Sequence, residues 1–363
     1  MIIDRIEAFP LTIPFGAGAA LPGPARPAAV RSLLVKVTTD EGHEGWGEAF
    51  GFEATPVTRR ALEDLVAPLC AGQDATRIGP LNRAVQEKLH VFGRGGSVIH
   101  ALSAVDTALW DIAGKAAGVP LHRLLGGSGN PDLACYASLD PYGEPAAVRA
   151  GVRQALGAGF THAKLHEREA AAVRAARDEA GPGTGLMLDV NCPWTLAQAR
   201  EKAGQFRDLR LKWLEEPLWP PEDYDGLARL RAACGIPLAA GENVPALLDF
   251  GRLMGAGAVD FVQPSPAKMG GVTELCKVFQ AAAARGVTVM PHTFYHGPGL
   301  LAAVHATAAL GPADSMIEWR YTDLQARVYG EAVQPEHGRI RVPQEPGLGA
   351  APDPEVLRRY LDA

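Results

Sequence analysis

The chain has 363 residues, of which 47% are hydrophobic, and its formal net charge is −6. This length allows one large barrel domain with a smaller domain beside it, each with a buried core. Charges of both signs are scattered and no basic run occurs, so we expect no nucleic-acid partner. No apolar segment is long enough to cross a bilayer, so we expect no membrane span.

The cysteines and the N-terminal residues bear on the cellular compartment. The 5 cysteines are widely spaced and include no CxxC pair, which favours a reducing environment over a disulfide framework. The first residues include an acid, Asp4, and lack the basic and then apolar layout of a signal peptide. We therefore expect a cytoplasmic protein.

The first part of the chain predicts an α+β domain of roughly 120 residues. Apolar residues alternate with polar ones over Ile2–Ala8, as in a half-buried strand, and residues 15–27 are rich in Gly, Ala and Pro, as in a loop. Ser32–Thr38 predicts a second strand, and a turn at Asp40–Gly42 leads into a return at Gly45–Glu48.

Residues 56–120 have a helical pattern. Between Ile99 and Ile112 the apolar residues recur at spacings of three and four, which is one face of a helix. Gly118 and Pro120 predict the end of that helix.

From about residue 133, short apolar runs alternate with Ala-rich helical runs. The apolar runs are Ala134–Ser138, His162–Leu165, Leu186–Val190, Lys212–Leu214, Pro237–Ala240, Asp260–Val262, Thr288–Met290 and Met316–Ile317. Polar residues at the ends of seven of them are 23 to 27 residues apart: His166, Asp189, Glu215, Glu242, Ser265, His292 and Glu318. This spacing is typical of βα units, and functional residues of such barrels lie at the C-terminal ends of the strands. A further strand is expected in the tail, around Gly338–Pro343, packing back on the first domain.

Three of these residues, Asp189, Glu215 and Glu242, predict a metal site. Carboxylates from neighbouring strands would repel one another unless a hard divalent cation, most plausibly Mg²⁺, lay between them. The simpler alternative is that each acid lies at the N-terminus of the following helix and favours its dipole. Asn191, two residues after Asp189 and on the same face, is expected to support the metal site.

A series of short motifs runs in order through the chain: GWGEAF (45–50), SAVDTALWDIAGKAAGVPLHRLLGG (103–127), AKLH (163–166), LDVN (188–191), WLEEP (213–217), GEN (241–243), KMGG (268–271), PHT (291–293) and IEW (317–319). Together they resemble the mandelate racemase/muconate lactonizing enzyme group of the enolase superfamily. The resemblance implies an α/β fold, with an N-terminal α+β capping domain over a modified TIM barrel, (β/α)₇β. Residues 1–125, completed by 326–363, would form the capping domain, and 126–325 the barrel. It also implies one Mg²⁺ and abstraction of a proton α to a carboxylate through an enediolate.

Lys164 and His166 are two residues apart on one short strand, so both side chains should point to the same face. By resemblance, Lys164 lies near the substrate carboxylate and the metal, and His166 occupies the position of a base, where the family often has a second lysine. Whether His166 is the base or binds substrate hydroxyls stays open, and the residue that removes the α-proton is either His166 or Lys164. A neighbouring Lys164 ammonium and Mg²⁺ are expected to keep His166 neutral.

By resemblance, His292 is the histidine on the opposite face of the substrate, and Ser265 stands where mandelate racemase-like members have an aspartate that pairs with it. Without that charge, His292 is better suited to protonating a leaving hydroxyl, or to donating a hydrogen bond, than to acting as a strong base. Lys268 is interpreted as structural. Glu318 matches the acid that hydrogen-bonds the substrate carboxylate, for which it would have to be protonated.

We therefore expect a lyase that dehydrates an acid sugar or a related hydroxy acid. The alternatives are a racemase or epimerase of a carboxylate substrate, a cycloisomerase, and an inactive metal-binding paralogue. The expected partners are a small carboxylate substrate and, by resemblance, further copies of the chain in a dimer or octamer. Substrate choice is expected to lie with the loops Phe15–Pro27 and Gly51–Glu53.

Overall fold

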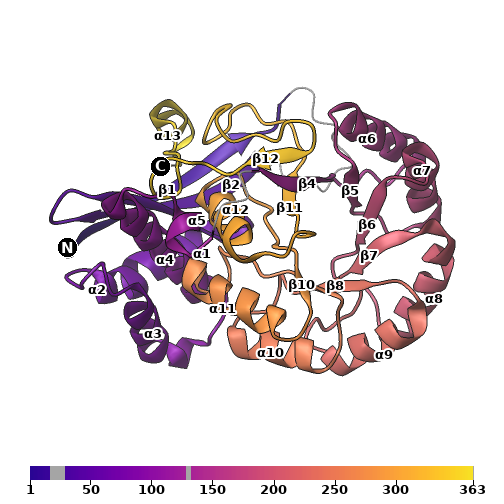
Figure 1. The fold of residues 1–363 in the computed structure, drawn as a ribbon, viewed down its shortest axis with the longest axis horizontal. Helices are drawn as coiled ribbons and strands as arrows, with labels where there is room; N and C mark the ends of the chain where they lie inside the picture. The colour runs from indigo at the N-terminus through magenta and orange to yellow at the C-terminus, as the bar shows by residue number, and fades with distance from the viewer. Residues whose placement is uncertain (17–28, 128–131, 363) are drawn as a thin grey trace.

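The computed structural model describes residues 1–16, 29–127 and 132–362, so most of the loop predicted at residues 15–27 lies outside the described residues. The N-terminal strands form an antiparallel sheet in the order β1 (Ile3–Pro14), β2 (Ala29–Thr39), β3 (Glu44–Ala49). These are the two predicted strands and the predicted return. Figure 1 shows this sheet and its helices on one side of the molecule and the barrel on the other.

The helices of the N-terminal part are α1 (Thr55–Ala61), α2 (Ala67–Cys70), α3 (Ile78–Lys88), α4 (Gly96–Ala117) and α5 (Leu121–Leu124). Helix α4 carries the predicted apolar face and ends at Gly118, whose φ of +68° suits a left-handed cap. It packs directly on β3: a Cβ at Gly47 would lie 1.8 Å from the carbonyl oxygen of Ala104. The glycines of the GWGE segment thus allow the close approach of sheet and helix.

The barrel strands lie where the apolar runs predict them: β4 (Asp132–Ser138), β5 (His162–Leu165), β6 (Gly185–Asp189), β7 (Leu211–Glu215), β8 (Leu238–Ala240), β9 (Phe261–Val262), β10 (Thr288–Val289) and β11 (Ile317–Arg320). Between them lie α6 (Pro145–Gly157), α7 (Ala170–Ala180), α8 (Leu196–Phe206), α9 (Tyr224–Cys234), α10 (Leu247–Gly255), α11 (Gly271–Ala283) and α12 (Pro298–Leu310). The parallel order is β10-β9-β8-β7-β6-β5-β4-β11. Over the described residues this alternation is the expected (β/α)₇β architecture (Figure 1).

Side chains, rather than a backbone ladder, join the two ends of this sheet. Ser315 Oγ donates to the Val289 carbonyl at 2.9 Å, and Thr293 Oγ1 donates to the Glu318 carbonyl at 2.6 Å. The segments around β10 and β11 are thereby held together, and the curled sheet encloses an interior.

The tail differs from the expectation. Its strand, β12 (Arg339–Arg341), lies in the predicted segment but pairs antiparallel with β4 of the barrel instead of with the first sheet. The final helix, α13 (Pro354–Tyr360), is the part that lies against β1, where Leu361 forms a bridge with Leu11. The division into domains at residues 125 and 325 stays a prediction.

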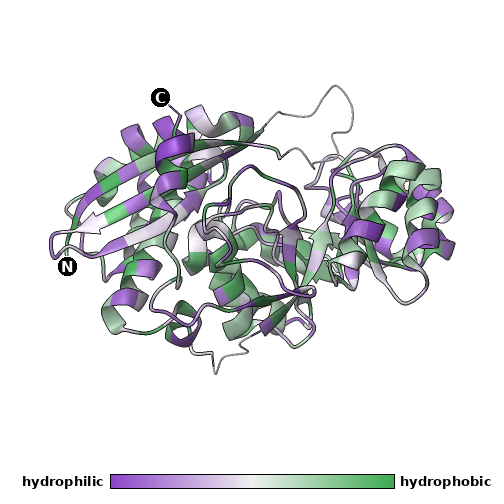
Figure 2. Cartoon of the chain, turned by 90° about the horizontal axis from the view of Figure 1, so that it is seen from above, coloured by the Kyte–Doolittle hydropathy of each residue, from purple (hydrophilic) through white to green (hydrophobic). Residues whose placement is uncertain are grey.

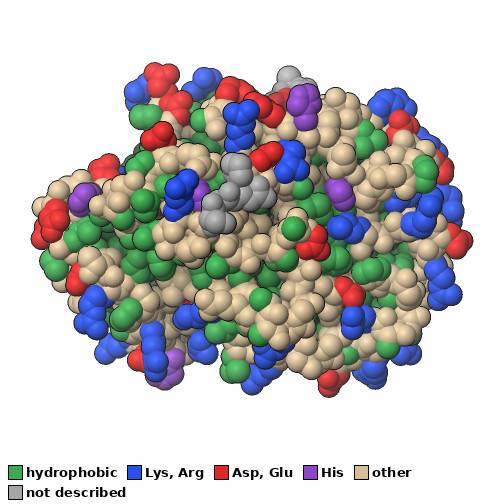
Figure 3. Space-filling model, in the orientation of Figure 1, with side chains coloured by type: hydrophobic (Ala, Val, Ile, Leu, Met, Phe, Trp, Pro, Cys, Tyr) green, Lys and Arg blue, Asp and Glu red, His purple; other side chains and the backbone are tan. Residues whose placement is uncertain are grey.

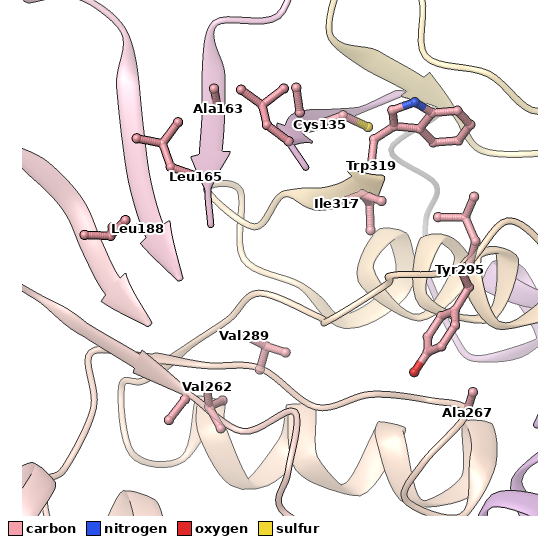
Figure 4. Packing of buried hydrophobic residues seen from close by; sticks show 14 of the residues in the cluster. Cys135, Ala163, Leu165, Leu188, Val262, Ala267, Val289, Tyr295, Ile317 and Trp319 are labelled. Carbon is pink, nitrogen blue, oxygen red and sulfur yellow. The ribbon is translucent and has the colours of Figure 1, made fainter. Parts of the chain in front are cut away.

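Alternate residues of each barrel strand face opposite ways. Ala163 and Leu165 of β5 join the apolar layer between strands and helices (Figure 4), so Lys164 between them points into the barrel. A second apolar cluster fills the interior: Tyr136, Met187, Trp213, Ala239, Met290 and Met316. Hydrophilic and hydrophobic residues are mixed along the outer helices (Figure 2), and no described helix is long and apolar enough to cross a membrane.

Buried carboxylates of the N-terminal part bind the first residues of barrel helices. Glu48 of β3 accepts a hydrogen bond from the Gly299 N–H at 3.0 Å, at the start of α12. Asp106 of α4 accepts one from the Thr273 N–H at 2.9 Å, at the start of α11. Both groups lie at helix N-termini, where backbone N–H donors have no partner within the helix. These contacts tie the first domain to the barrel beside the strand ends.

Candidate active site

The three acids of the predicted metal site come together at the C-terminal ends of adjacent strands. Asp189 and Glu215 are the last residues of β6 and β7 and lie opposite each other in the ladder, and Glu242 follows β8. One carboxylate oxygen from each lies within 4.8 Å of the others. Asp189 and Glu215 are buried, and Glu242 is partly buried. Oxygen ligands at this separation suit a hard cation such as Mg²⁺.

Lys164 lies among these acids. Its Nζ is 2.7 Å from Glu215 Oε1, 2.7 Å from Glu318 Oε1 and 3.2 Å from Asp189 Oδ2. Burial alone would lower the pKa of Lys164, but the carboxylates outweigh it and raise the pKa well above its usual value. Lys164 is therefore an ammonium ion.

The expectation of a protonated Glu318 is wrong for this arrangement. Burial acts to raise the pKa of Glu318, but the Lys164 ammonium outweighs burial and the pKa falls to about 2. The Thr293 N–H also donates to Glu318 Oε2 at 3.0 Å. In this arrangement Glu318 is thus an ionised acceptor that holds Lys164 in place.

His166 follows β5 and contacts two acceptors. Its Nδ1 is 2.5 Å from the Leu139 carbonyl oxygen, and its Nε2 is 3.3 Å from Asp189 Oδ2. Burial lowers the pKa of His166, but the hydrogen bond and charge of Asp189 outweigh both burial and the Lys164 charge, so the pKa is raised. Among the side chains alone, Asp189 therefore outweighs Lys164. The expectation of a neutral ring rested on Lys164 and Mg²⁺ together, and it stays a prediction.

His292 has a carboxylate on one nitrogen and a hydroxyl on the other. Its Nε2 is 3.0 Å from Glu242 Oε2, and its Nδ1 is 3.2 Å from Ser265 Oγ. Ser265 Oγ in turn forms a short hydrogen bond with the buried Tyr295 hydroxyl. Ser265 thus contacts His292 from the position that, by resemblance, an aspartate occupies in mandelate racemase-like members. Tyr295 is a residue that sequence reasoning missed.

Asn191 supports Asp189 through its backbone. Its N–H donates to Asp189 Oδ1 at 3.0 Å, while its side chain is exposed. Strand β6 ends at Asp189 and Asn191 has a φ of +53°, so the alternation of a strand no longer applies at this position. The prediction that its side chain shares a face with Asp189 is therefore wrong.

The buried Glu216, next to Glu215, was also missed. Its Oε1 accepts the Gly241 N–H at 2.9 Å, and the Cys192 thiol lies 3.0 Å from its Oε2. Burial and the charge of Glu242 raise the pKa of Glu216 to about 7. Glu216 therefore links the segments that carry the three acids, and the doubled acid of the WLEEP motif was the available signal.

Lys268 contacts an aromatic ring and a side-chain amide. Its Nζ is 4.7 Å from the centre of the Phe50 ring and 3.3 Å from Asn243 Oδ1. On the face shown in Figure 3, the other Lys and Arg side chains are scattered and interspersed with acids, without a broad basic surface.

An acid triad and a buried lysine at the strand ends of a (β/α)₇β barrel, beneath an α+β domain, define an enzyme site for carboxylate chemistry. Residues 28–126 match the mandelate racemase/muconate lactonizing enzyme N-terminal domain, and residues 147–356 match the enolase C-terminal domain-like family. The chain belongs to the mandelate racemase/muconate lactonizing enzyme group of the enolase superfamily.

The similarity to individual relatives extends over nearly the whole chain. A D-galactonate dehydratase from Ralstonia pickettii is 32% identical over 92% of this chain and 92% of its own length. The crystal structure of the 3,6-anhydro-D-galactonate cycloisomerase from Zobellia galactanivorans superposes with a TM-score of 0.89, with 31% identity over 100% of both chains. A racemase from Streptomyces coelicolor, crystallised with bound magnesium, gives a TM-score of 0.87 with 28% identity over 99% of this chain and 100% of its own.

Proposed function

We propose that this protein is a Mg²⁺-dependent enzyme that removes the proton α to a carboxylate and dehydrates an acid sugar or a related hydroxy acid. The similarity to a D-galactonate dehydratase supports the reaction and the substrate class. The reacting residues are those at the strand ends, where this family of barrels carries its chemistry.

Asp189, Glu215 and Glu242 would hold the Mg²⁺. Asp189, Glu215 and Glu318 contact the single Lys164 ammonium, and Glu242 adds a further carboxylate to the triad. A divalent cation would offset this surplus of negative charge. The bound magnesium of the Streptomyces coelicolor racemase supports this choice of metal. When bound, Mg²⁺ supplies the positive charge that stabilises an enediolate relative to the substrate carboxylate.

His166 is the proposed base. The Leu139 carbonyl can only accept a hydrogen bond, so Nδ1 of His166 carries a proton. When the ring loses one proton, the lone pair is therefore on Nε2, the nitrogen that faces the acid triad. Lys164 is a poor base because its carboxylate partners keep it charged, and it is proposed to orient the substrate carboxylate.

His292 is the proposed acid. The Glu242 carboxylate can only accept, so Nε2 of His292 carries a proton directed at the metal site, while Nδ1 contacts the Ser265 hydroxyl. Phe294 lies near both imidazoles, at ring-centre distances of 6.0 Å from His166 and 6.3 Å from His292. A leaving β-hydroxyl that takes the Nε2 proton of His292 departs as water.

Both Nε2 atoms face a carboxylate, that of Asp189 for His166 and that of Glu242 for His292, so the observation that carries the proposal is the difference at Nδ1. The Leu139 carbonyl holds a proton on Nδ1 of His166, whereas the Ser265 hydroxyl can donate to Nδ1 of His292 and leave the proton of that neutral ring on Nε2. This difference favours elimination over racemisation, which needs a base on each face of the substrate. The test is to incubate the Mg²⁺-loaded enzyme with D-galactonate and other sugar acids in D₂O and to trap 2-keto acids with semicarbazide.

His292→Asn should keep α-deuterium exchange and lose keto-acid formation, whereas His166→Asn should lose both. A His292→Asn variant that still dehydrates at the wild-type rate, or a wild-type enzyme that exchanges no α-proton from any acid, would contradict the proposal. His305→Asn is a control, because His305 is buried at α5 and α12, paired with His122.

Cycloisomerisation is the second candidate, favoured by the superposition with the Zobellia galactanivorans cycloisomerase. The same base and acid would act, but the leaving oxygen would be part of a ring and stay in the product. Mass spectrometry separates the two, since a dehydrated product is lighter by one water and an isomerised product keeps the mass of its substrate.

A further inference from the structure

A cavity of about 290 Å³ lies between the first domain and the barrel, beside the acid triad. This volume is near the lower end of the range of small-molecule sites, roughly 300–1,000 Å³. Glu242 belongs to both the triad and the cavity wall, so the two spaces adjoin. The wall residues are Phe50, Gly96, His100, Glu242, Asn243, Val244, Pro245 and Lys268.

Lys268 supplies the positive charge of this wall. An ammonium group has three N–H donors, and the Asn243 side chain at 3.3 Å engages one of them. The Phe50 ring lies beneath the charge, at 4.7 Å. Within the described part of the chain, no carboxylate forms an ion pair with Lys268, in contrast to Lys164 with its three acids.

His100 is a further polar residue of the wall and adds no positive charge. Burial, and then the charge of Lys268, lower the pKa of His100 to about 4, so its ring is neutral near pH 7. The hydrogen bond to the Phe50 backbone uses one ring nitrogen, which leaves the other for a hydroxyl. The wall thus offers one cation and one imidazole nitrogen to a small polar ligand. The Asn243 amide is engaged by Glu242 and Lys268, and the Glu242 carboxylate belongs to the side shared with the triad.

We propose that this cavity is the subsite for the end of the substrate remote from the reacting carboxylate, and that Lys268 recognises a second carboxylate there. This inference rests on the proposed function, because the adjoining triad must hold the reacting end. It assigns the substrate to the sugar diacids in preference to the monoacids. The competing role for Lys268 is structural, as a cation held over Phe50 to brace the two domains.

The test compares galactarate with D-galactonate, six-carbon acids that differ in the group at C6, a carboxylate in one and a hydroxymethyl in the other. Binding of each to the Mg²⁺-loaded protein is measured by isothermal titration calorimetry. Wild type should bind galactarate roughly tenfold more tightly, the effect of one charge-assisted contact at a half-buried site. Lys268→Met should reduce this ratio to near one and leave the affinity for D-galactonate nearly unchanged.

Lys268→Arg should keep most of the preference, because it keeps the charge. The matched control is Lys277→Met, since Lys277 is ion-paired with Glu274 on α11 and is not part of the cavity wall. A wild type without preference for galactarate, or a Lys268→Met variant that weakens both acids equally, would overturn the inference. Binding does not require turnover, so failure of the proposed reaction shows separately, as absence of α-deuterium exchange in D₂O.

Discussion

The buried carboxyl of Glu48 gives a pH dependence of stability that can be worked out from the structure. Glu48 is 2% exposed and accepts hydrogen bonds from the Gly299 and Gly297 N–H groups and from Ser32, where β3 meets the start of α12. Burial outweighs these hydrogen bonds and raises the pKa of Glu48 from 4.5 to about 7. We predict that ionisation of this carboxyl weakens the contact between the first domain and the barrel.

The direction of the effect follows from proton linkage. Below pH 4.5 the carboxyl is protonated in both folded and unfolded chains, and its contribution to stability is fully present. As the pH rises towards 7, the unfolded chain releases its proton while folded Glu48 keeps it, so this stability is progressively lost. A pKa rise of this size corresponds to a loss of roughly 3 kcal/mol in the free energy of unfolding.

Glu48→Gln removes the ionisation and keeps the shape of the side chain. Its free energy of unfolding, measured by urea denaturation from pH 5 to pH 8, should fall less steeply than that of wild type, by up to roughly 3 kcal/mol over this range. Glu44→Gln is the control, because Glu44 lies on the same strand but is exposed and paired with Lys36. If Glu48→Gln and wild type differ by the same amount at every pH, the reasoning is refuted.

Three further predictions concern the site. Lys164→Met should lower the free energy of unfolding by about 3–5 kcal/mol in EDTA, because it leaves buried carboxylates unpaired; a urea midpoint like that of wild type would contradict this. Mg²⁺ at 100 times its dissociation constant for the wild type should raise the free energy of unfolding of the wild type by about 2.7 kcal/mol, and that of Glu215→Gln by much less. Thermal unfolding measures this difference. Removal of the metal should abolish turnover. Ser265→Ala should lower kcat by roughly tenfold with little change in KM, since His292 loses the hydroxyl that orients its ring; equal kcat values would argue against that role.

Much of the fold could be predicted because its signals are local. Each barrel strand is a short apolar run, and each helix between strands repeats apolar residues at helical spacing. The regular interval between Asp189, Glu215 and Glu242 follows from the length of one βα unit, which is why their meeting at one point could be predicted. The pairing of β12 with β4 could not, because partner choice for a three-residue strand depends on which sheet edge is near it in space.

The chemical states of the site residues depended on contacts between distant parts of the chain. Glu318 was expected to be protonated, yet it lies against the Lys164 ammonium and is ionised. For His166, the hydrogen bond and charge of Asp189 raise the pKa, while burial and the charge of Lys164 lower it. No sequence pattern encodes these distances, and a shift of about an ångström would change the balance of burial against charge.

The sequence by itself determined the order of strands and helices, the family and the three acids, because periodicity and spacing are properties of the linear chain. Only the tertiary structure decided which nitrogen of His166 and of His292 faces the acid triad, since those assignments depend on a carbonyl, a carboxylate and a hydroxyl from other segments. The tertiary structure also decided the position of Lys268. The sequence alone suggested a structural residue, whereas in the fold Lys268 lies over the Phe50 ring in the wall of a cavity. The local sequence pattern determines which residues lie at the strand ends. The protonation of their side chains and the recognition of a substrate depend on neighbouring residues that only folding brings into contact.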